Sequence, residues 1–353
     1  MVVTRHYTIA TKAGLNRYMD QSVLDLHKRA TVVDAHMDTL LDIMVPPARP
    51  AKLPIPRKFG ERSEKGHVDL PRLLESGIDL QVFAAYIQPE YKIERALHRT
   101  VQLIDRFYQE LHAHEDKLML FTKVSDVHEA ERRGKVAAML SIEGGEAAEA
   151  DLGILRILHH LGVKAMTLTW NERNQIADGA AEGRTKGGLT NFGVELVGEM
   201  NRIGMVVDVS HISDAGFFDV IQTTKSPIIA SHSNCRAVCN HRRNLTDEMI
   251  KLLADNGGVT GMNFAPAFVD ERKENATLER VLDHVDHVVK IAGVDHVGLG
   301  SDFDGIETTP KGLEDVTRMP YFTEGLVKRG YKEDDILKIL GGNFLRVFRK
   351  VIG

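Results

Sequence analysis

The hydrophobic pattern of the chain alternates between two periods. Short apolar runs rich in β-branched residues, typical of buried strands, are followed by longer stretches with apolar residues three and four positions apart, typical of amphipathic helices. We expect eight strands, at residues 31–38, 80–87, 136–145, 164–170, 204–211, 227–233, 258–264 and 296–302. We expect helices within residues 91–115, 151–162, 190–204, 212–222, 246–258 and 276–294. Several of these stretches end at glycine, a common C-terminal stop of helices.

This alternation predicts the fold class. Apolar strands that are each followed by a helix indicate a parallel sheet covered by helices, and eight such units predict a closed (β/α)8 TIM-like barrel. An open doubly wound sheet is the alternative, but no G-x-G-x-x-G motif follows the first strand and no P-loop motif occurs. We expect residues 1–353 to form a single barrel domain, closed by helices within residues 331–353. Residues 45–66 are rich in proline and charge, and we expect a long loop there, either a lid over the site or a disordered insertion.

Composition narrows the function classes. The 353 residues, 43% of them hydrophobic, suffice for a sizeable core. A net charge of −5, from 45 basic and 50 acidic residues, gives no basic field for nucleic acid or a membrane surface. No stretch approaches the apolar length of a signal peptide or a membrane span, and Cys235 and Cys239 are too few for a disulfide framework or a zinc knuckle. We therefore expect a cytoplasmic protein that binds neither nucleic acid nor membranes.

The predicted strands share polar side chains at their C-terminal ends. His36 and Asp38 are two positions apart, so a strand would point both into the same space. Six imidazole and carboxylate groups are distributed in this way along the chain: His36, Asp38, Glu143, His211, His232 and Asp302. One such histidine alone is commonly a structural residue. The C-terminal strand ends of a (β/α)8 barrel form one face, however, so we expect all six groups to converge there.

Convergence of these groups would favour a metal site. Imidazole and carboxylate ligands suit zinc, with manganese or iron as alternatives, and the lack of a cysteine ligand argues against a purely structural zinc. Five ligands exceed the needs of one catalytic ion with an open position, but they suit two ions that share a bridging carboxylate and a bridging hydroxide. Such a pair lowers the pKa of its water towards ~7 and supplies hydroxide at neutral pH. Asp34 and Asp208, which precede ligand candidates in their strands, could orient imidazoles.

The motifs HMD, SIEGGEA, MTLTWN, VDVSH, ASHSN, RRNLTDE and GSDFDG occur in this order. From about residue 30 onward, the chain resembles the membrane dipeptidase (renal dipeptidase) family of binuclear zinc peptidases, peptidase family M19, a branch of the amidohydrolase-like barrels. The resemblance implies two Zn²⁺ ions per chain, with His36 and Asp38 on one, His211 and His232 on the other, and Glu143 between them. It implies further that Asp302 is the catalytic acid/base and that Arg243 holds the substrate carboxylate, as its planar fork would suit.

The sequence departs from the better-known members of the family at one position. Where they carry a histidine thought to polarise the scissile carbonyl, this chain has Trp170. An indole N–H can donate one hydrogen bond but carries no charge. Either the zinc ions polarise the carbonyl, or the substrate differs, or Trp170 only packs.

Three functions follow from these observations. The first is a binuclear zinc dipeptidase that acts on small dipeptides, including those with a D-residue at the C-terminal position. The second keeps the metal site but acts on N-acyl amino acids or cyclic amides, for which Trp170 is the main support. The third, a non-catalytic metal-binding barrel, predicts a missing ligand or acid/base residue, and none is missing. Barrels of this kind commonly form a homo-oligomer, but the helical faces of this sequence assign no dimer surface.

Overall fold

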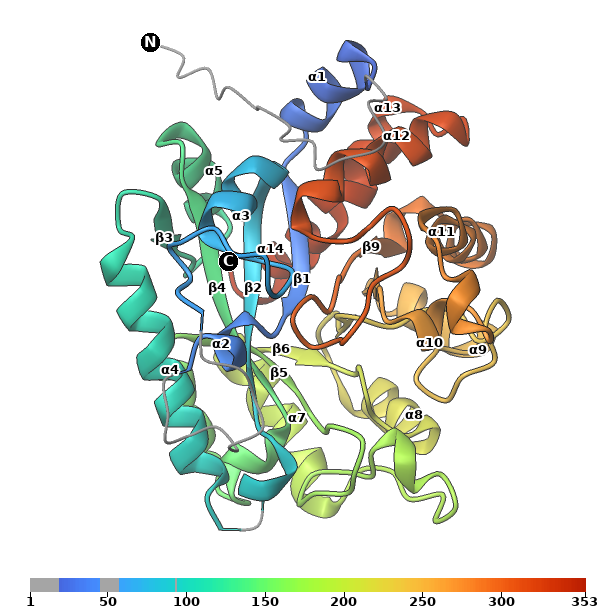
Figure 1. Cartoon of the computed structure of the whole chain (residues 1–353). Coiled ribbons are helices and arrows are strands. Elements are labelled where there is room, and N and C mark those ends of the chain that lie inside the picture. Colours follow the sequence, from blue (N-terminus) through green and yellow to red (C-terminus); the bar gives the residue numbers. More distant parts are fainter. Residues whose placement is uncertain (1–18, 45–56, 93) are drawn as a thin grey trace.

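The protein, seen in a computed structural model that describes residues 19–44, 57–92 and 94–353, is built on a closed parallel barrel (Figure 1). Its eight strands are β1 (Val32–Met37), β2 (Ile78–Tyr86), β4 (Val136–Glu143), β5 (Val163–Thr167), β6 (Val206–Asp208), β7 (Ile229–Ala230), β8 (Val259–Met262) and β9 (Val297–Leu299). They pair in this order, and β9 pairs back with β1. The (β/α)8 prediction is confirmed, and the open doubly wound alternative is wrong because the sheet closes.

The apolar pattern missed one short strand. β3 (Leu118–Leu120) pairs only with the first residues of β4, outside the closed ring. Three residues are too few to show a period of two, so no pattern in the sequence could separate this strand from the helix before it.

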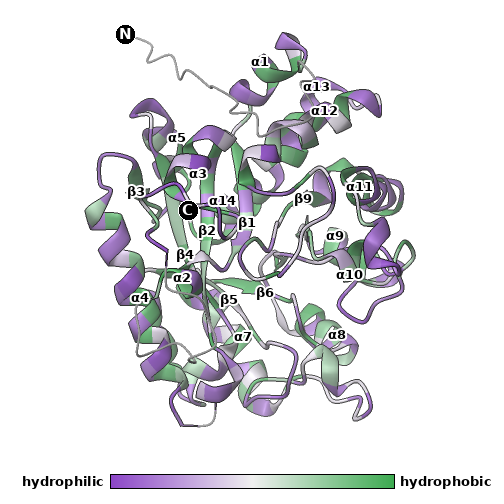
Figure 2. Cartoon of the chain, viewed as in Figure 1, coloured by the Kyte–Doolittle hydropathy of each residue, from purple (hydrophilic) through white to green (hydrophobic). Residues whose placement is uncertain are grey.

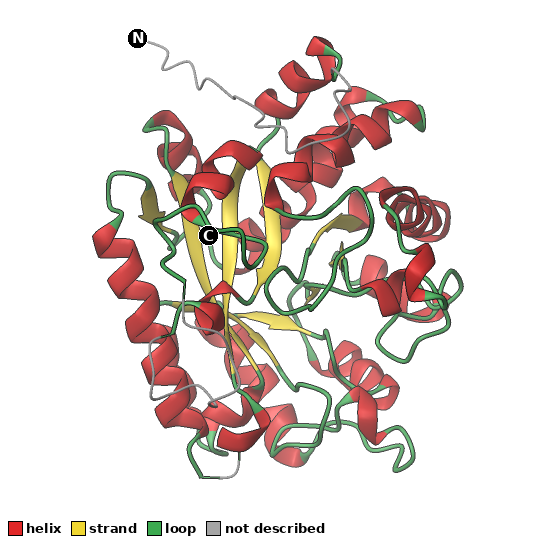
Figure 3. Ribbon diagram, viewed as in Figure 1, coloured by secondary structure: helices red, strands yellow, loops and turns green. Residues whose placement is uncertain are grey.

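Helices cover the outside of the barrel (Figure 3). The six helices expected between strands appear as α4 (Ala96–Ala113), α6 (Leu152–His160), α7 (Asn191–Ile203), α8 (Asp214–Thr223), α9 (Asp247–Asp255) and α11 (Leu278–Ala292). The others are α1 (Gln21–Arg29), α2 (Thr39–Asp42), α3 (Leu70–Ser76), α5 (Ser125–Arg132), α10 (Pro266–Val269), α12 (Met319–Lys328), α13 (Glu333–Leu337) and α14 (Asn343–Val351). Side-chain caps fix several starts: the hydroxyls of Thr190, Ser213 and Thr277 accept the N–H three residues on.

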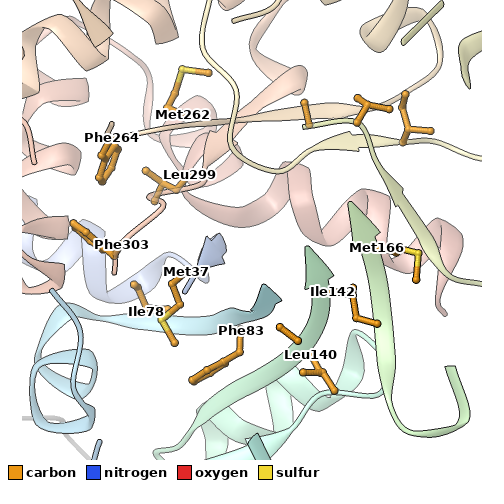
Figure 4. Packing of buried hydrophobic residues seen from close by; sticks show 14 of the residues in the cluster. Met37, Ile78, Phe83, Leu140, Ile142, Met166, Met262, Phe264, Leu299 and Phe303 are labelled. Carbon is orange, nitrogen blue, oxygen red and sulfur yellow. The ribbon is translucent and has the colours of Figure 1, made fainter. Parts of the chain in front are cut away.

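Strand alternation separates two layers of the core. In β4, Ala137 and Met139 belong to a cluster that includes Phe344 and Phe348 of α14, whereas Leu140 packs towards the helices outside. Figure 4 shows the outer layer, with residues from several strands side by side, and Figure 2 shows hydrophobic strands inside helices whose outer faces are polar. The C-terminal segment contains α13, a π-helical turn (Lys338–Gly342) and α14, and α14 packs on the barrel.

Two further expectations concern segments beyond the barrel. The proposed lid at residues 45–66 lies largely outside the described residues, since 45–56 are not described. At its described end, the Arg57 guanidinium donates to Asp304, beside the barrel mouth. Among the described helices, none combines the length and the apolar character that crossing a membrane requires.

Candidate metal centre

Glu143, the last residue of β4, lies at the centre of a buried cluster of imidazole and carboxylate groups. Its Oε1 atom is 3.0 Å from His211 Nε2 and 3.5 Å from His232 Nε2, and its Oε2 atom is 3.6 Å from His36 Nε2. His36 Nε2 is also 3.5 Å from Asp38 Oδ2. The structure therefore brings together all five groups that the sequence singles out as ligand candidates, at the C-terminal mouth of the barrel.

The backbone does not place these groups as the alternation of a regular strand would. Of the five, only His36 and Glu143 lie within strands; Asp38 follows β1, at the N-cap of α2. Against β2, the register of β1 is irregular between Asp34 and Met37, and such a bulge can re-aim the side chain that it contains. His36 and Asp38 therefore meet where the strand register is irregular and the chain turns into α2, not along a regular strand.

Two site residues adopt a left-handed backbone. His211 has φ 69° and Asp302 has φ 62°, a region that non-glycine residues seldom occupy and that costs of order 1 kcal/mol or more. Both lie three residues after a strand, β6 and β9 respectively. Such conformations persist where the surroundings hold them, and they cluster at functional sites. Here they turn an imidazole and a carboxylate back over the barrel mouth.

The cluster fits a divalent cation on the evidence of its own polar atoms. His36 Nε2 and Asp38 Oδ1 are buried and have no hydrogen-bond partner, although burial of such groups without one is costly. Two overlapping groups have ligand atoms within reach of one ion: His36 with Glu143 and His232, and His36 with Asp38 and Asp302. Buried oxygen and imidazole nitrogen atoms left unpaired at this spacing suit a metal such as zinc.

Electrostatics within the cluster point the same way. Burial disfavours a charged His36, but the carboxylates of Glu143 and Asp38 outweigh burial and raise its pKa well above the ordinary value. Burial together with the charge of Glu143 raises the pKa of Asp38 to about 8. For His211, burial and then the charge of Arg243 lower the pKa well below the ordinary value. Without a cation, the raised pKa values of His36 and Asp38 favour protons on these two groups, which a metal would displace.

Asp302 lies at the edge of the cluster and is held by its own partners. Its Oδ2 atom accepts a hydrogen bond of 2.9 Å from Asn263 Nδ2, and its backbone N–H donates to the His36 carbonyl at 3.1 Å. A β-carbon at Gly305 would lie 2.1 Å from Asp38 Oδ2 and 2.5 Å from Asp302 Oδ1. Only glycine lets the backbone approach both carboxylates this closely.

A pocket of about 200 Å³ opens beside these groups. Asp38, Glu143, His211 and Asp302 line it together with apolar side chains, namely Leu41, Tyr86, Trp170, Ala265, Phe268 and Ile306. The volume lies below the several hundred Å³ usual for drug-sized ligands. The pocket is therefore suited to a small substrate.

Trp170 forms part of the pocket wall. Its indole stacks on the His211 ring, with centroids 5.9 Å apart, and it packs against Tyr86 at 5.3 Å. The Lys92 ammonium lies 4.8 Å from the indole centroid and forms ion pairs with Glu172 and Glu146. Trp170 thus faces the space next to a ligand candidate, which leaves it available for both packing and substrate contact.

Arg243 is buried behind the cluster rather than in the main pocket. It lines a narrow adjoining cavity that also includes His211. Its Nη1 and Nη2 atoms make only long hydrogen bonds, 3.4 Å to Ser233 Oγ and 3.3 Å to the His232 carbonyl, and its Nε atom has no partner. Burial lowers its pKa to about 10, against the opposing charges of Asp302 and Glu143. None of the ion pairs among the described residues includes this guanidinium.

Several residues that hold the site side chains in place are not among those predicted from the sequence. Asn171 Oδ1 lies 3.0 Å from His211 Nδ1, Asn263 holds Asp302, and Ser231 Oγ lies 2.8 Å from His232 Nδ1. Asn263 could have been noticed as a polar residue at the end of an apolar predicted strand, and Ser231 by its place next to a ligand candidate. Of the two aspartates suggested as orienting groups, Asp34 hydrogen-bonds Ser301 and Gln81 rather than an imidazole.

Comparison with known proteins finds dipeptidases and metallopeptidases similar to this chain. The sequence model of the membrane dipeptidase family (peptidase family M19) matches residues 20–352. The dipeptidase tcpJ of Claviceps purpurea is 36% identical over 295 residues, which cover 81% of this chain and 69% of that protein.

Solved structures agree in fold. A dipeptidase described as a family M19 metallopeptidase superposes with a TM-score of 0.82 at 29% identity, covering 92% of this chain and 99% of that one. A metallopeptidase from Rhodobacter sphaeroides, liganded with a phosphinate mimic of the dipeptide L-Ala-D-Ala, superposes with a TM-score of 0.81 at 28% identity, covering 91% and 99%.

Proposed function

The chain belongs to the membrane dipeptidase family, peptidase family M19, whose members are metal-dependent hydrolases, and we propose that it is a binuclear zinc dipeptidase. Its substrates in this proposal are small dipeptides with a free carboxylate, including those with a D-residue at the C-terminal position. The observation that carries the proposal is the buried cluster around Glu143, with two unpartnered ligand atoms beside a pocket of about 200 Å³. The dipeptide mimic held by the Rhodobacter relative supports the substrate class.

The residues would divide between two ions around a shared carboxylate. Glu143 presents one oxygen to His211 and His232 and the other to His36, which suits a bridge. His36 and Asp38 would hold one ion, and the two remaining imidazoles the other. When bound, zinc polarises a carbonyl and lowers the pKa of its water towards ~7.

Asp302 is the proton carrier in this proposal. One carboxylate oxygen is occupied by Asn263, while Asp302 also lines the pocket. A carboxylate fixed in this way can take a proton from the attacking water and return it to the leaving amine, provided that both lie within hydrogen-bond reach.

Arg243 is the proposed partner of the substrate carboxylate. A buried guanidinium without a carboxylate partner is costly, and an anionic ligand would supply the missing hydrogen bonds. Since Arg243 adjoins His211 through the narrow cavity, we place the carboxylate of the leaving residue on that side of the cluster.

Metal analysis combined with a substrate panel tests the proposal. We expect about two zinc ions per chain after loading, and hydrolysis of L,L and L,D dipeptides that stops on chelation and returns with zinc. N-acyl-D-amino acids and cyclic amides serve as the comparison set. Failure to bind metal, or failure on every dipeptide by the loaded protein, would overturn the proposal.

A second candidate keeps the metal centre and changes the substrate. The uncharged indole of Trp170 packs against Tyr86 and lines the pocket together with Phe268, so the wall favours an apolar acyl group. Turnover of N-acyl amino acids or cyclic amides without turnover of dipeptides would select this function. The same panel therefore separates the two.

A further inference from the structure

His232, one of the imidazoles beside Glu143, is connected to the buried carboxylate of Asp208 through the hydroxyl of Ser231. Ser231 Oγ lies 2.6 Å from Asp208 Oδ2 and 2.8 Å from His232 Nδ1. All three residues are almost completely buried. The chain of contacts runs from the end of β6 to the residues after β7, so it joins two neighbouring strand ends.

Asp208 can only accept in this arrangement. Four donors converge on its two oxygens: Oδ2 receives the hydroxyls of Thr167 and Ser231, at 2.6 Å each, and Oδ1 receives the backbone N–H groups of Ser210 and Ser231, at 3.0 and 2.9 Å. Asp208 accepts in all four of these hydrogen bonds and donates in none.

The direction of the next hydrogen bond follows from this count. A serine hydroxyl has one hydrogen, and Ser231 gives it to Asp208. Towards His232 the same oxygen can only accept, so His232 must carry its proton on Nδ1. In a neutral imidazole the other nitrogen then bears a free electron pair, and that nitrogen, Nε2, lies 3.5 Å from Glu143 Oε1.

The neighbouring imidazole, that of His211, also carries its proton on Nδ1. His211 Nδ1 lies 3.0 Å from the amide oxygen of Asn171, which accepts, so the free electron pair of His211 is also on Nε2. The two Nε2 atoms are only 2.9 Å apart. Two electron pairs at this distance repel one another, and a metal ion bound to both nitrogens would relieve that repulsion.

We infer that the Asp208–Ser231 pair is a positioning device that fixes the tautomer of His232 so that Nε2 is always free to bind a metal ion. The inference rests on the proposed metal centre for its use, but the tautomer itself is a property of the metal-free chain. Partners that orient a ligating histidine in this way typically contribute about 10- to 100-fold to metal affinity. Asp34 forms a similar pair with Ser301, but no imidazole depends on that hydroxyl, so the device is specific to His232.

Thr167→Val is a matched control for Ser231→Ala. Each substitution removes one hydroxyl that donates a 2.6 Å hydrogen bond to Asp208 Oδ2, but only the Ser231 hydroxyl also contacts His232. A purely structural role of the hydroxyls would make the two variants alike. Thermal unfolding of both metal-free variants, compared with the parent, reports how much stability each change costs.

Nitrogen-15 NMR of histidine-labelled, metal-free protein tests the tautomer directly. We expect the His232 signal, identified by its loss in His232→Gln, to show a protonated Nδ1 in the parent and in Thr167→Val, and a protonated Nε2 in Ser231→Ala. A parent protein protonated on Nε2, or an unchanged tautomer in Ser231→Ala, would overturn the inference.

Zinc titration against a chromophoric chelator tests the consequence. Ser231→Ala should lose about 10- to 100-fold in affinity at one site, and Thr167→Val should stay within about twofold of the parent. Equal losses in both variants would show that the hydroxyls act only through stability. If the parent itself binds no zinc, the metal centre fails, whereas the NMR spectra still decide the tautomer.

Discussion

At the scale of the residue, hydrogen bonds with its neighbours hold both the backbone and the carboxylate of Asp302 in place. Its backbone is held in a left-handed conformation by the bond from its N–H to the His36 carbonyl, and its carboxylate is oriented by Asn263. Neither contact engages both carboxylate oxygens, so the group keeps an acceptor for a proton. Asp302 also lies within reach of an ion beside His36 and Asp38, and we assign metal binding to those two residues and proton transfer to Asp302.

Asp302→Asn should therefore remove turnover while leaving the metal in place. The amide has nearly the same shape but cannot accept and return a proton, so we expect kcat to fall by about 10²- to 10⁴-fold. Zinc content, measured by elemental analysis, should match the parent protein. An unchanged rate would exclude the proposed role, and a parallel loss of zinc would mean that Asp302 is mainly a ligand.

Gly305 provides a second prediction at this scale. In Gly305→Ala the new methyl group would lie 2.1 Å from Asp38 Oδ2, so one carboxylate must move out of position. We expect a loss of zinc affinity and of activity, measured by chelator competition and by kcat/KM. Gly183→Ala is the control, because a β-carbon there meets no atom within 4 Å. Equal behaviour of the two variants would contradict the close approach.

The sequence could identify the candidate ligands and one residue of the supporting network, Asp208, but not the other supporting residues. Histidine and carboxylate groups at strand ends are rare enough to be noticed together, whereas Ser231, Asn171 and Asn263 are common surface types whose role depends on hydrogen bonds across strands. The roles of Arg243 and Trp170 stay predictions, because their chemistry depends on a bound substrate.

At the scale of elements, strands ended earlier than the apolar pattern suggested. The run at 227–233 contains only the two-residue strand β7, and 204–211 contains only β6. The residues that follow these strands, 209–211 and 231–233, are buried but lie in turns, and these turns carry His211 and His232. Hydrophobic runs report burial, so they cannot tell a strand from the buried turn that follows it.

Helix α11 is anchored by a neutral histidine. His284 Nδ1 accepts the Cys235 N–H at 3.1 Å, and Nε2–H donates to the Val269 carbonyl at 2.9 Å. Burial lowers the pKa of His284 to about 4. Because the folded pKa lies below the unfolded value of ~6.5, the unfolded chain binds the proton more tightly, and stability is lost as pH falls from about 6.5 towards 4.

Acid sensitivity should therefore fall in His284→Gln. The pKa difference corresponds to about 3 kcal/mol of unfolding free energy across this pH window, which the variant would no longer lose. Urea unfolding of metal-free protein at pH 7 and pH 5 captures about 2 kcal/mol of this difference, because pH 5 lies about 1.5 units below the unfolded pKa. The variant should be less stable at pH 7 but show a smaller change between the two. His27, buried at α1 with a pKa lowered to about 4, remains in both proteins and cancels in the comparison. The same pH change in both proteins would contradict this account.

At the scale of the whole molecule, the metal centre draws on strands from both ends of the sequence. β1 carries His36, β4 carries Glu143, and the residues after β9 carry Asp302. A ligand that binds only the folded state stabilises it, by about 4 kcal/mol when its free concentration is a thousand times Kd. If one barrel domain spans the chain, this stabilisation acts on a single unfolding transition.

Chelation should consequently lower the midpoint of one cooperative thermal transition, and added zinc should restore it. Differential scanning calorimetry with and without chelator measures both the shift and the number of transitions. Magnesium, a poor match for imidazole ligands, is the control ion. Two independent transitions would argue against the single domain, and an unmoved midpoint would argue against the metal centre.

The overall architecture was predictable because it depends on coarse alternation repeated eight times, so that a missed strand such as β3 changes nothing essential. Closure itself was inferred from the number of units. What no pattern could supply is the order of hydrogen bonds inside the mouth, where distances of a few tenths of an ångström decide which atoms meet.

The pairing of β9 with β1 also determines when the barrel can close during biosynthesis. A nascent polypeptide emerges from the ribosome with His36 and Asp38 early and Asp302 near the end. Until β9 docks beside β1, His36 and Asp38 face solvent on the open side of an incomplete barrel. Because all five ligand candidates have been synthesised before β9, we expect an ion bound before the barrel closes to be held less tightly than one bound afterwards.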